Sequence, residues 1–274
     1  MKKRGKEGIF LSLLLEDRHC TLSYSRTETP VQSAYYRHSH LSYELLYFVE
    51  GDAHYHVEGK EFLLHPGDLV FIPPKNYHFL QLRSSAPYER YCVNFDAAIL
   101  PAESHERLAL LPTVRNLAGD EAVASCFFRL SDYAARFSEA DARLMLRCIL
   151  REMLLNLLYA APPEEGGRIR HHPIIDRIIA LTDAEPERDW TAASLAEALY
   201  LSPSYVQNTF SRYMGIGLKT YINHKRVLYA QSLLLAGDRP AEVCEACGFR
   251  DYSTFYRLFR SVTGMAPSAV AREG

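Results

Sequence analysis

The stretch HSHLSYELLYFVEG, residues 38–51, places two histidines and a glutamate close together. His38, His40 and Glu44 have the spacing of metal ligands, and His78 supplies a third imidazole further along the chain. Three imidazoles and one carboxylate can hold Fe, Mn, Zn or Ni. Imidazole nitrogens can equally form a hydrogen-bonding wall around a small molecule. The residue types alone leave both a metal centre and a binding pocket open.

A second set of candidate residues lies on an internal repeat near the C-terminal end. LAEALYLS (195–202) parallels VCEACGFRD (243–251), with one extra residue in the second copy. Each copy predicts a helix, a tight turn and a second helix, because an N-cap residue precedes the second apolar segment and a glycine follows it. The matched positions, at an offset of 49 residues, are Ser202 and Asp251, Val206 and Phe255, Phe210 and Phe259, and Gly215 and Gly264.

The second helix of each copy has a polar face whose residue types suit base edges and phosphates. Arg matches guanine, Gln and Asn match adenine, and short hydroxyls match either. One such face would equally suit solvent. Two faces joined by a helix over 218–235, about 27 Å long at ~1.5 Å per residue, can reach successive major grooves about 34 Å apart. The expected DNA-contacting residues are Ser204, Gln207, Asn208 and Arg212 in the first copy and Ser253, Thr254, Arg257 and Arg260 in the second.

Local charge supports a nucleic-acid partner for this part of the chain. Residues 202–272 carry nine Lys or Arg against four Asp or Glu, a net charge of +5, although the whole chain has a net charge of −2. Residues 171–201 carry two against six, a net charge of −4. A basic half inside a near-neutral protein therefore predicts DNA binding by that half alone.

The elements that must position the first candidate set are strands. Up to about Asp96, short runs rich in Tyr, Val, Phe and Leu alternate with Gly and Pro turns. This texture predicts an antiparallel barrel or sandwich, and Ile9–Leu15 is its expected first strand. Strand alternation would place Tyr36, His38 and His40 on one face.

From about Asp120 the pattern is helical, and residues 138–160 carry apolar side chains on two faces. One face can cover the barrel and the other can meet a second subunit; a helix wholly buried in its own domain is the alternative. Charges placed at Leu150 and Leu157 are expected to separate the subunits. The two stripes are Leu146, Leu150, Met153 and Leu157, and Leu144, Cys148, Leu155 and Leu158.

The segment PPEEGGRIR, residues 162–170, combines Pro, Gly and charge and predicts a linker. We expect an α+β chain: residues 1–161 form a barrel with dimerisation helices, and residues 171–274 form an all-α domain. No apolar stretch approaches the ~20 residues needed to cross a bilayer, and six scattered cysteines predict reduced thiols in the cytoplasm. Cys244 and Cys247 are expected to pack in a core.

The C-terminal residues resemble the AraC/XylS family of bacterial transcription regulators over about 171–272. The similarity is carried by LxxxLxLSPSYVxxxF, Tyr221-Ile222, CGFRDYSTFYRLFR, Gly264 and Pro267. It implies that the helices over 203–214 and 252–263 enter successive major grooves of double-stranded DNA. We expect an activator that works with RNA polymerase, with repression as the alternative; the apolar stripes of residues 138–160 predict a homodimer, and no membrane partner is expected.

The front domain resembles the cupin fold, through H-x-H-x3-E-x6-G and through Gly67, Pro73 and His78. Lys75 and Leu82 depart from that pattern. Sensor domains of AraC/XylS regulators look similar and hold a small molecule in the barrel. We therefore expect a sugar or related metabolite as effector, with no cofactor and no required metal. The alternative is a metal-dependent cupin enzyme with a DNA-binding tail. The expected effector-binding residues are Tyr36, His38, His40, Glu44 and His78. In the alternative enzyme, the three histidines and Glu44 would be the metal ligands.

Overall fold

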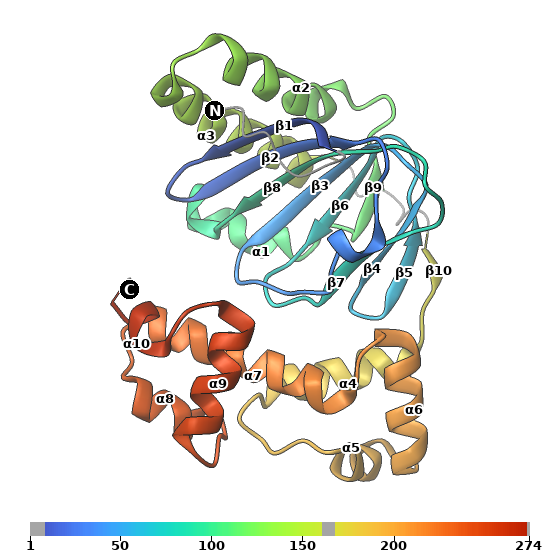
Figure 1. Cartoon of the computed structure of the whole chain (residues 1–274), viewed down its shortest axis with the longest axis vertical. Helices are drawn as coiled ribbons and strands as arrows, with labels where there is room; N and C mark the ends of the chain where they lie inside the picture. The colour runs from blue at the N-terminus through green and yellow to red at the C-terminus, as the bar shows by residue number, and fades with distance from the viewer. Residues whose placement is uncertain (1–8, 161–167, 273–274) are drawn as a thin grey trace. The chain divides into compact units, whose positions relative to one another are not determined.

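The computed structural model describes residues 9–160 and 168–272. They fall into two compact units, one made of residues up to 57 together with 61–170, the other of residues 58–60 together with 171–274 (Figure 1). Most of the expected linker lies outside the described residues. Its last three residues, Arg168–Arg170, form the short strand β10.

The first unit is built on two sheets. The long pairings are antiparallel, as predicted: β2 pairs with β8, β8 with β3, and β4 with β7. In spatial order the six-stranded sheet contains β1 (Ile9–Glu16), β2 (Cys20–Thr27), β8 (Tyr88–Phe95), β3 (Tyr43–Glu50), β6 (Asp68–Ile72) and β9 (Val114–Asn116). The four-stranded sheet contains β10, β5 (Lys60–Leu63), β4 (Ala53–Val57) and β7 (His78–Leu82).

Strand alternation gives the six-stranded sheet two different faces. Alternate residues of β8, such as Val93 and Phe95, are buried in a core that includes the helices of this unit. Residues between them face the four-stranded sheet, where a second core includes Phe48 of β3 and Tyr88 of β8. The unit is therefore layered as helices, sheet and sheet.

Two helices, α2 (Glu121–Arg136) and α3 (Glu139–Tyr159), cover the outer face of the six-stranded sheet (Figure 1). Ser138 caps α3 by accepting a hydrogen bond from the Asp141 N–H at 3.2 Å. Shorter helical turns lie between strands, one between β2 and β3 and three between β8 and β9. They are η1 (Gln32–Ala34), η2 (Ala97–Ile99), η3 (Ala102–Ser104) and α1 (His105–Leu108).

The first predicted stripe of α3 is entirely core, because Leu146, Leu150, Met153 and Leu157 are all nearly or fully buried. The expectation that charges at Leu150 and Leu157 would separate subunits is therefore wrong: they would disrupt this core. On the second stripe, Leu144 is 50% exposed and Leu155 is 40% exposed. Leu158 is buried instead.

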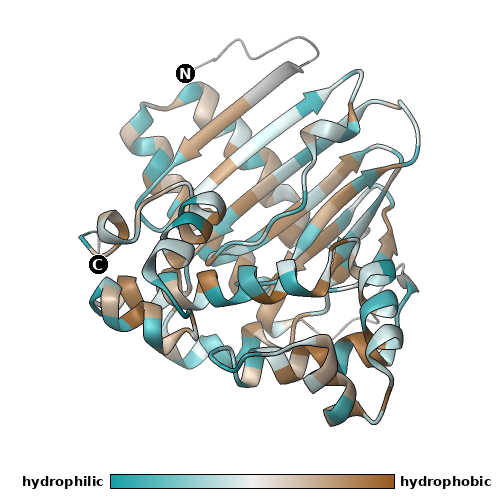
Figure 2. Ribbon diagram, turned by 60° about the horizontal axis from the view of Figure 1, so that its bottom comes forward, coloured by the Kyte–Doolittle hydropathy of each residue, from teal (hydrophilic) through white to brown (hydrophobic). Residues whose placement is uncertain are grey.

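The second unit is all helical, as predicted. Its helices are α4 (Pro173–Ala184), α5 (Ala192–Leu199), α6 (Pro203–Met214), α7 (Leu218–Leu235), α8 (Pro240–Ala246), α9 (Tyr252–Thr263) and α10 (Pro267–Val270). Hydrophobic and hydrophilic residues interleave along them (Figure 2). Cys244 and Cys247 are buried in the core of α7 to α10, so their predicted packing role is confirmed. None of the helices described here is long and apolar enough to span a membrane.

Candidate functional site

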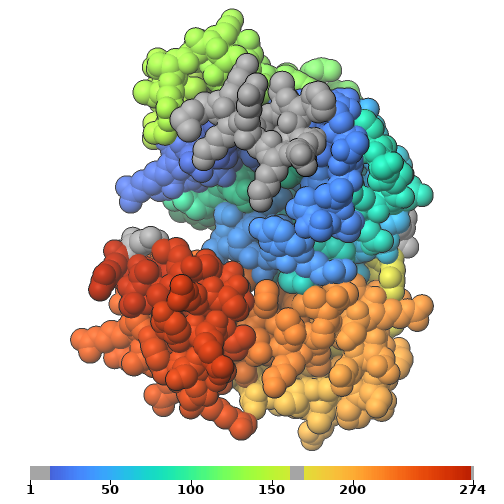
Figure 3. Space-filling model, in the orientation of Figure 1, coloured from blue at the N-terminus to red at the C-terminus, as the bar shows by residue number. Residues whose placement is uncertain are grey.

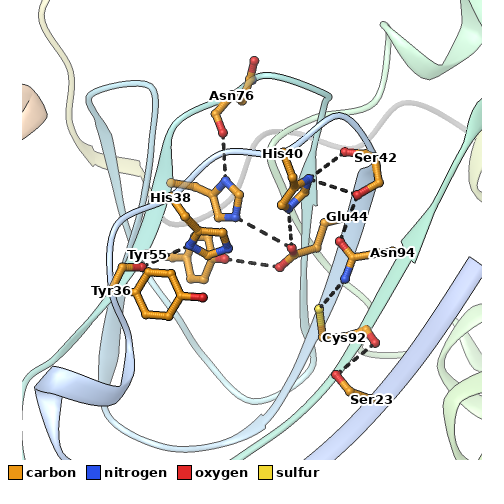
Figure 4. A network of polar contacts seen from close by, with 11 residues as sticks. Ser23, Tyr36, His38, His40, Ser42, Glu44, Tyr55, Asn76, Cys92 and Asn94 are labelled. Carbon is orange, nitrogen blue, oxygen red and sulfur yellow. Dashed lines mark hydrogen bonds and ion pairs between the residues drawn. The ribbon is translucent and has the colours of Figure 1, made fainter. Parts of the chain in front are cut away.

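The four side chains of the first candidate set meet inside the strand-rich unit (Figure 4). One ligand atom each from His38, His40, Glu44 and His78 lies within 4.8 Å of the others. Glu44 lies on β3 and His78 begins β7, whereas the other two histidines lie in the loop before β3. Reciprocal backbone N–H to carbonyl hydrogen bonds of 3.1 and 2.9 Å join His38 to His78. This isolated bridge holds the loop against β7 and fixes the backbone positions from which both imidazoles project.

Backbone carbonyls decide which nitrogen is protonated in two of the rings. Nδ1 of His38 lies 3.1 Å from the carbonyl oxygen of Tyr36, and Nδ1 of His78 lies 2.8 Å from that of Asn76. A carbonyl oxygen can only accept, so each Nδ1 carries the hydrogen and each neutral ring keeps a lone pair on Nε2. The buried Nε2 of His78 has no hydrogen-bond partner in the described part of the chain.

Glu44 supplies the negative charge of this group. It is buried, its Oε2 lies 2.9 Å from Nε2 of His40, and its Oε1 accepts from the Tyr55 hydroxyl at 3.5 Å. Burial alone would raise the pKa of Glu44, but the imidazoles of His40 and His78 hold that pKa well below its usual range. Burial, followed by the charge of His78, lowers the pKa of His38 to about 4, so His38 is neutral near pH 7.

The donor set fits a divalent transition metal. Nδ1 of each histidine lies within 3.1 Å of a backbone carbonyl, the arrangement that orients metal-binding imidazoles. In the tetrahedral geometry usual for zinc, ligand atoms with bonds of about 2.0–2.2 Å lie about 3.4 Å apart, so the most separated ligand atoms of the four residues would have to approach each other by about 1.4 Å. A metal held by His38, His40, His78 and Glu44 would act as a Lewis acid on an oxygen atom of a bound molecule.

A cavity of about 250 Å³ adjoins these four residues. Tyr36, His38, His40 and Glu44 line it, whereas His78 is fully buried and does not. Tyr36 is 72% exposed, which places it at the rim. The structure thus brings four of the five expected effector-binding residues to one cavity, whereas His78 lies behind its wall.

A further wall of the cavity comes from β8, which the sequence analysis did not identify. Tyr88, Arg90, Cys92 and Asn94 all line the cavity. The signal was present in YERYCVNF, because every second residue of a strand shares a face and Arg90 stands among those facing inward. The sequence did not show which strand would pair with β3.

In the second unit, α6 and α9 present the expected polar faces to solvent. Ser202 and Asp251 cap them by accepting from the N–H groups of Tyr205 at 3.2 Å and Thr254 at 2.7 Å. Gly215 ends α6 in the left-handed conformation, and Gly264 does the same for α9. The residues expected at DNA are exposed except for Thr254, which is half-buried: Ser204, Gln207, Asn208, Arg212, Ser253, Arg257 and Arg260.

The two helices share one groove. Figure 3 shows the second unit as two neighbouring lobes, coloured orange and red. A groove of about 660 Å³ is lined by Gln207 of α6 and Thr254 of α9, with Lys219 and Asn223 of the connecting helix α7. The repeat predicted two matched helices joined by one long helix, and the structure has these three elements as α6, α9 and α7.

Comparison with known proteins accounts for both units. Residues 24–153 match the AraC-like ligand binding domain, and residues 195–273 match a helix-turn-helix domain. The chain is 27% identical over 218 residues to the uncharacterized HTH-type transcriptional regulator YijO of Escherichia coli, covering 76% of this chain and 74% of that protein. It is 26% identical over 223 residues to the arabinose operon regulatory protein of Escherichia coli, covering 77% and 74%.

A third relative is the transcriptional activator NphR of Rhodococcus, 27% identical over 241 residues that cover 82% of this chain and 68% of the relative. With an AraC-like ligand-binding domain followed by a helix-turn-helix domain, the chain is an AraC-family transcriptional regulator.

Proposed function

We propose that this regulator is a ligand-responsive activator that binds double-stranded DNA through α6 and α9. One observation carries the proposal: two capped helices, joined by α7, expose Gln, Asn, Arg and hydroxyl side chains to solvent, and Gln207 and Thr254 of the two helices line one groove. These residue types read base edges, and the basic segment that contains them attracts phosphates. Activation, through contact with RNA polymerase, follows the name of the Rhodococcus relative.

The effector belongs in the cavity of the strand-rich unit. Its lining combines His38, His40 and Glu44 with aliphatic and aromatic side chains, which suits a small polar metabolite. The printed name of the arabinose operon regulator points to a sugar or a related metabolite. A metal held beside the cavity would contribute to effector binding, and no catalytic step is required of it.

A homodimer is the proposed assembly, formed through the outer face of α3. Leu144, Cys148, Leu155 and Tyr159 are exposed and fall on one side of the helix at spacings of 4, 7 and 4 residues. Exposed apolar side chains in such a stripe form helix-to-helix contacts between subunits. Two subunits would present four recognition helices, so DNA affinity would increase without new contacts within each subunit.

Selection of DNA from a random duplex pool by the intact chain tests the proposal. We expect enrichment of sites with two conserved blocks about one helical turn, ~10 base pairs, apart. Affinity should decrease steeply with salt because phosphate-bound counterions are released. Failure to enrich any sequence, or affinity that is indifferent to salt, would overturn the proposed function.

The second candidate is a metal-dependent enzyme with a DNA-binding tail, and the histidine cluster is the observation that favours it. An enzyme would convert its ligand into a product, whereas a sensor returns it unchanged. Mass spectrometry of an effector recovered after prolonged incubation with the protein distinguishes the two. Recovery of the intact molecule is expected here.

A further inference from the structure

Arg90 is a cation on the wall of the effector cavity. It lies in the middle of β8, paired across the sheet with Ser25 of β2 and Phe48 of β3. Its Nη1 donates to the Ser25 hydroxyl at 2.8 Å. The guanidinium carbon lies 5.7 Å from the ring centroid of Tyr35 and 5.2 Å from that of Tyr88. The side chain is therefore held in place by aromatic rings and one hydroxyl.

No carboxylate of the described residues lies within 4.0 Å of this guanidinium, and among the same residues the Ser25 hydroxyl is the one acceptor for its five N–H donors. The same sheet does pair another arginine fully. Arg26 of β2 reaches Glu28, Glu50 and Glu89 at 2.9, 2.6 and 2.6 Å. Glu89 precedes Arg90 in the chain but faces the opposite side of the strand. The lack of a carboxylate partner therefore distinguishes Arg90 from Arg26 of the same sheet.

We propose that the effector is a small organic acid whose carboxylate is bound by Arg90. This inference rests on the proposed function of the cavity as the effector site. A guanidinium presents its donors in a planar fork that matches a carboxylate through two parallel hydrogen bonds. Burial of an arginine away from bulk water is unfavourable unless an anion pairs with its guanidinium, and a bound ligand can supply that anion.

The opposite end of the cavity orients the acid. In the β3–β8 register, Glu44 pairs with Asn94 and Phe48 pairs with Arg90, so the two charged residues stand four positions apart, about 13 Å along the strands. The Glu44 carboxylate repels an anion, which leaves the Arg90 end for the ligand's carboxylate. The Glu44 end favours a hydroxyl or amino group of the ligand, which can donate a hydrogen bond to the Glu44 carboxylate.

The cavity volume limits the size of the acid. A cavity of about 250 Å³ corresponds to the liquid volume of roughly eight water molecules at about 30 Å³ each. Leu46, Tyr55 and Leu80 provide the wall between the two ends. A hydroxylated or aromatic monocarboxylic acid of on the order of ten non-hydrogen atoms meets these conditions, whereas a neutral sugar leaves Arg90 without its anion.

Thermal unfolding of the intact chain with matched acid and neutral probes tests the proposal. The probes are 4-hydroxybenzoate against 4-hydroxybenzamide, and gluconate against glucose. We expect at least one acid to raise Tm while its neutral partner does not, and Arg90→Met to weaken that binding roughly tenfold or more. Arg83→Met is the matched control, because Arg83 lies outside the cavity lining and pairs with Asp52 at 2.9 Å. It should leave the acid response unchanged.

A measurement without ligand guards against failure of the variant to fold. If the role of Arg90 is to bind an anion, the ligand-free Arg90→Met protein should be at least as stable as the ligand-free wild type, since the substitution removes a cation that has no anionic partner. A neutral probe that binds as well as its acid, no acid that binds, or a large loss of Tm in the free variant overturns the inference. DNA selection by the intact chain tests the proposed function separately: acid binding without DNA binding would reject the regulator and retain the acid site.

Discussion

Nε2 of His78 lies 3.7 Å from Oε2 of Glu44, buried and without a hydrogen bond to any described residue. Asn76 holds the ring hydrogen on Nδ1, so the unprotonated Nε2 faces a carboxylate oxygen. Two electron-rich atoms at this distance repel each other unless a cation joins them. A proton on Nε2 of His78 or a metal ion would supply that cation, and the addition of metal to the protein distinguishes the two.

Added divalent metal is expected to stabilise the protein. Zn²⁺ or Ni²⁺ should raise Tm of the untagged, chelator-treated chain, and EDTA should reverse the increase, because His38, His40, His78 and Glu44 match the metal's ligand preferences. The His38→Ala, His40→Ala double variant should lose the shift. His65→Ala, which removes an exposed histidine outside the cluster, should retain it. An equal shift in the double variant would assign metal binding to another place.

The same double variant should lose its response to effector and keep its binding to DNA. His38 and His40 line the cavity, whereas the recognition helices belong to the other unit. Operator affinity is measured with and without an activating acid. Loss of DNA binding in the absence of effector would instead make these histidines part of the scaffold on which the DNA-binding function depends.

Replacement of both Leu144 and Leu155 by Glu is expected to produce monomers with an intact fold. Both side chains are exposed on α3, so the charges meet solvent in the monomer and each other in the dimer. Light scattering and circular dichroism measure the two properties. Leu150→Glu is the contrasting variant, and it should unfold the domain because Leu150 is fully buried. A double variant that remains dimeric would place the interface elsewhere.

Cysteine labelling gives an independent measure of this interface. Cys148 is exposed beside Leu144 and Leu155, whereas burial raises the pKa of Cys20 to about 12 and keeps that thiol protonated. Iodoacetamide should therefore label Cys148 and spare Cys20. Labelling of Cys148 should be faster in the monomeric variant than in the wild type. Equal rates would show that Cys148 lies outside the contact.

Acid should weaken the cap of α9 but not that of α6. The hydrogen bond from the Thr254 N–H lowers the pKa of Asp251. A carboxyl whose folded pKa is lowered contributes stability above its unfolded pKa, about 4, and loses it as pH falls through the folded value. Asp251→Ser, which copies the cap at Ser202, should therefore reduce the loss of unfolding free energy between pH 5 and pH 3. Urea titrations measure this difference, and identical losses in both proteins would contradict it.

The sequence predicted the helical unit in more detail than the strand-rich one. The helix expected over 218–235 has those bounds in the structure, because the periodicity of its apolar residues is a local signal. The helical periodicity alone does not determine which stripe of α3 packs against the sheet, so Leu150 and Leu157 were wrongly expected at the subunit interface. The place of Arg90 in the cavity could not be predicted for a related reason: it depends on the pairing of β3 with β8, which lies more than forty residues away in the chain.

Arg257→Ala is expected to relax sequence preference at one base position. Arg257 is exposed on α9, and its side chain contacts only its own helix, through the Ser253 carbonyl at 3.4 Å and the Thr254 hydroxyl at 3.5 Å. These weak contacts can be exchanged for a base edge, and a bidentate contact to guanine contributes about 1–3 kcal/mol of discrimination. Operator variants substituted at each position, titrated at fixed salt, give the preference directly.

Arg239→Ala is the control, since Arg239 is 84% exposed at the start of α8 and outside the groove. It should lower affinity equally for all sequences or not at all. If Arg257→Ala also weakens every operator equally, and lowers the salt dependence by about one ion, Arg257 contacts a phosphate and the base is read by its neighbours.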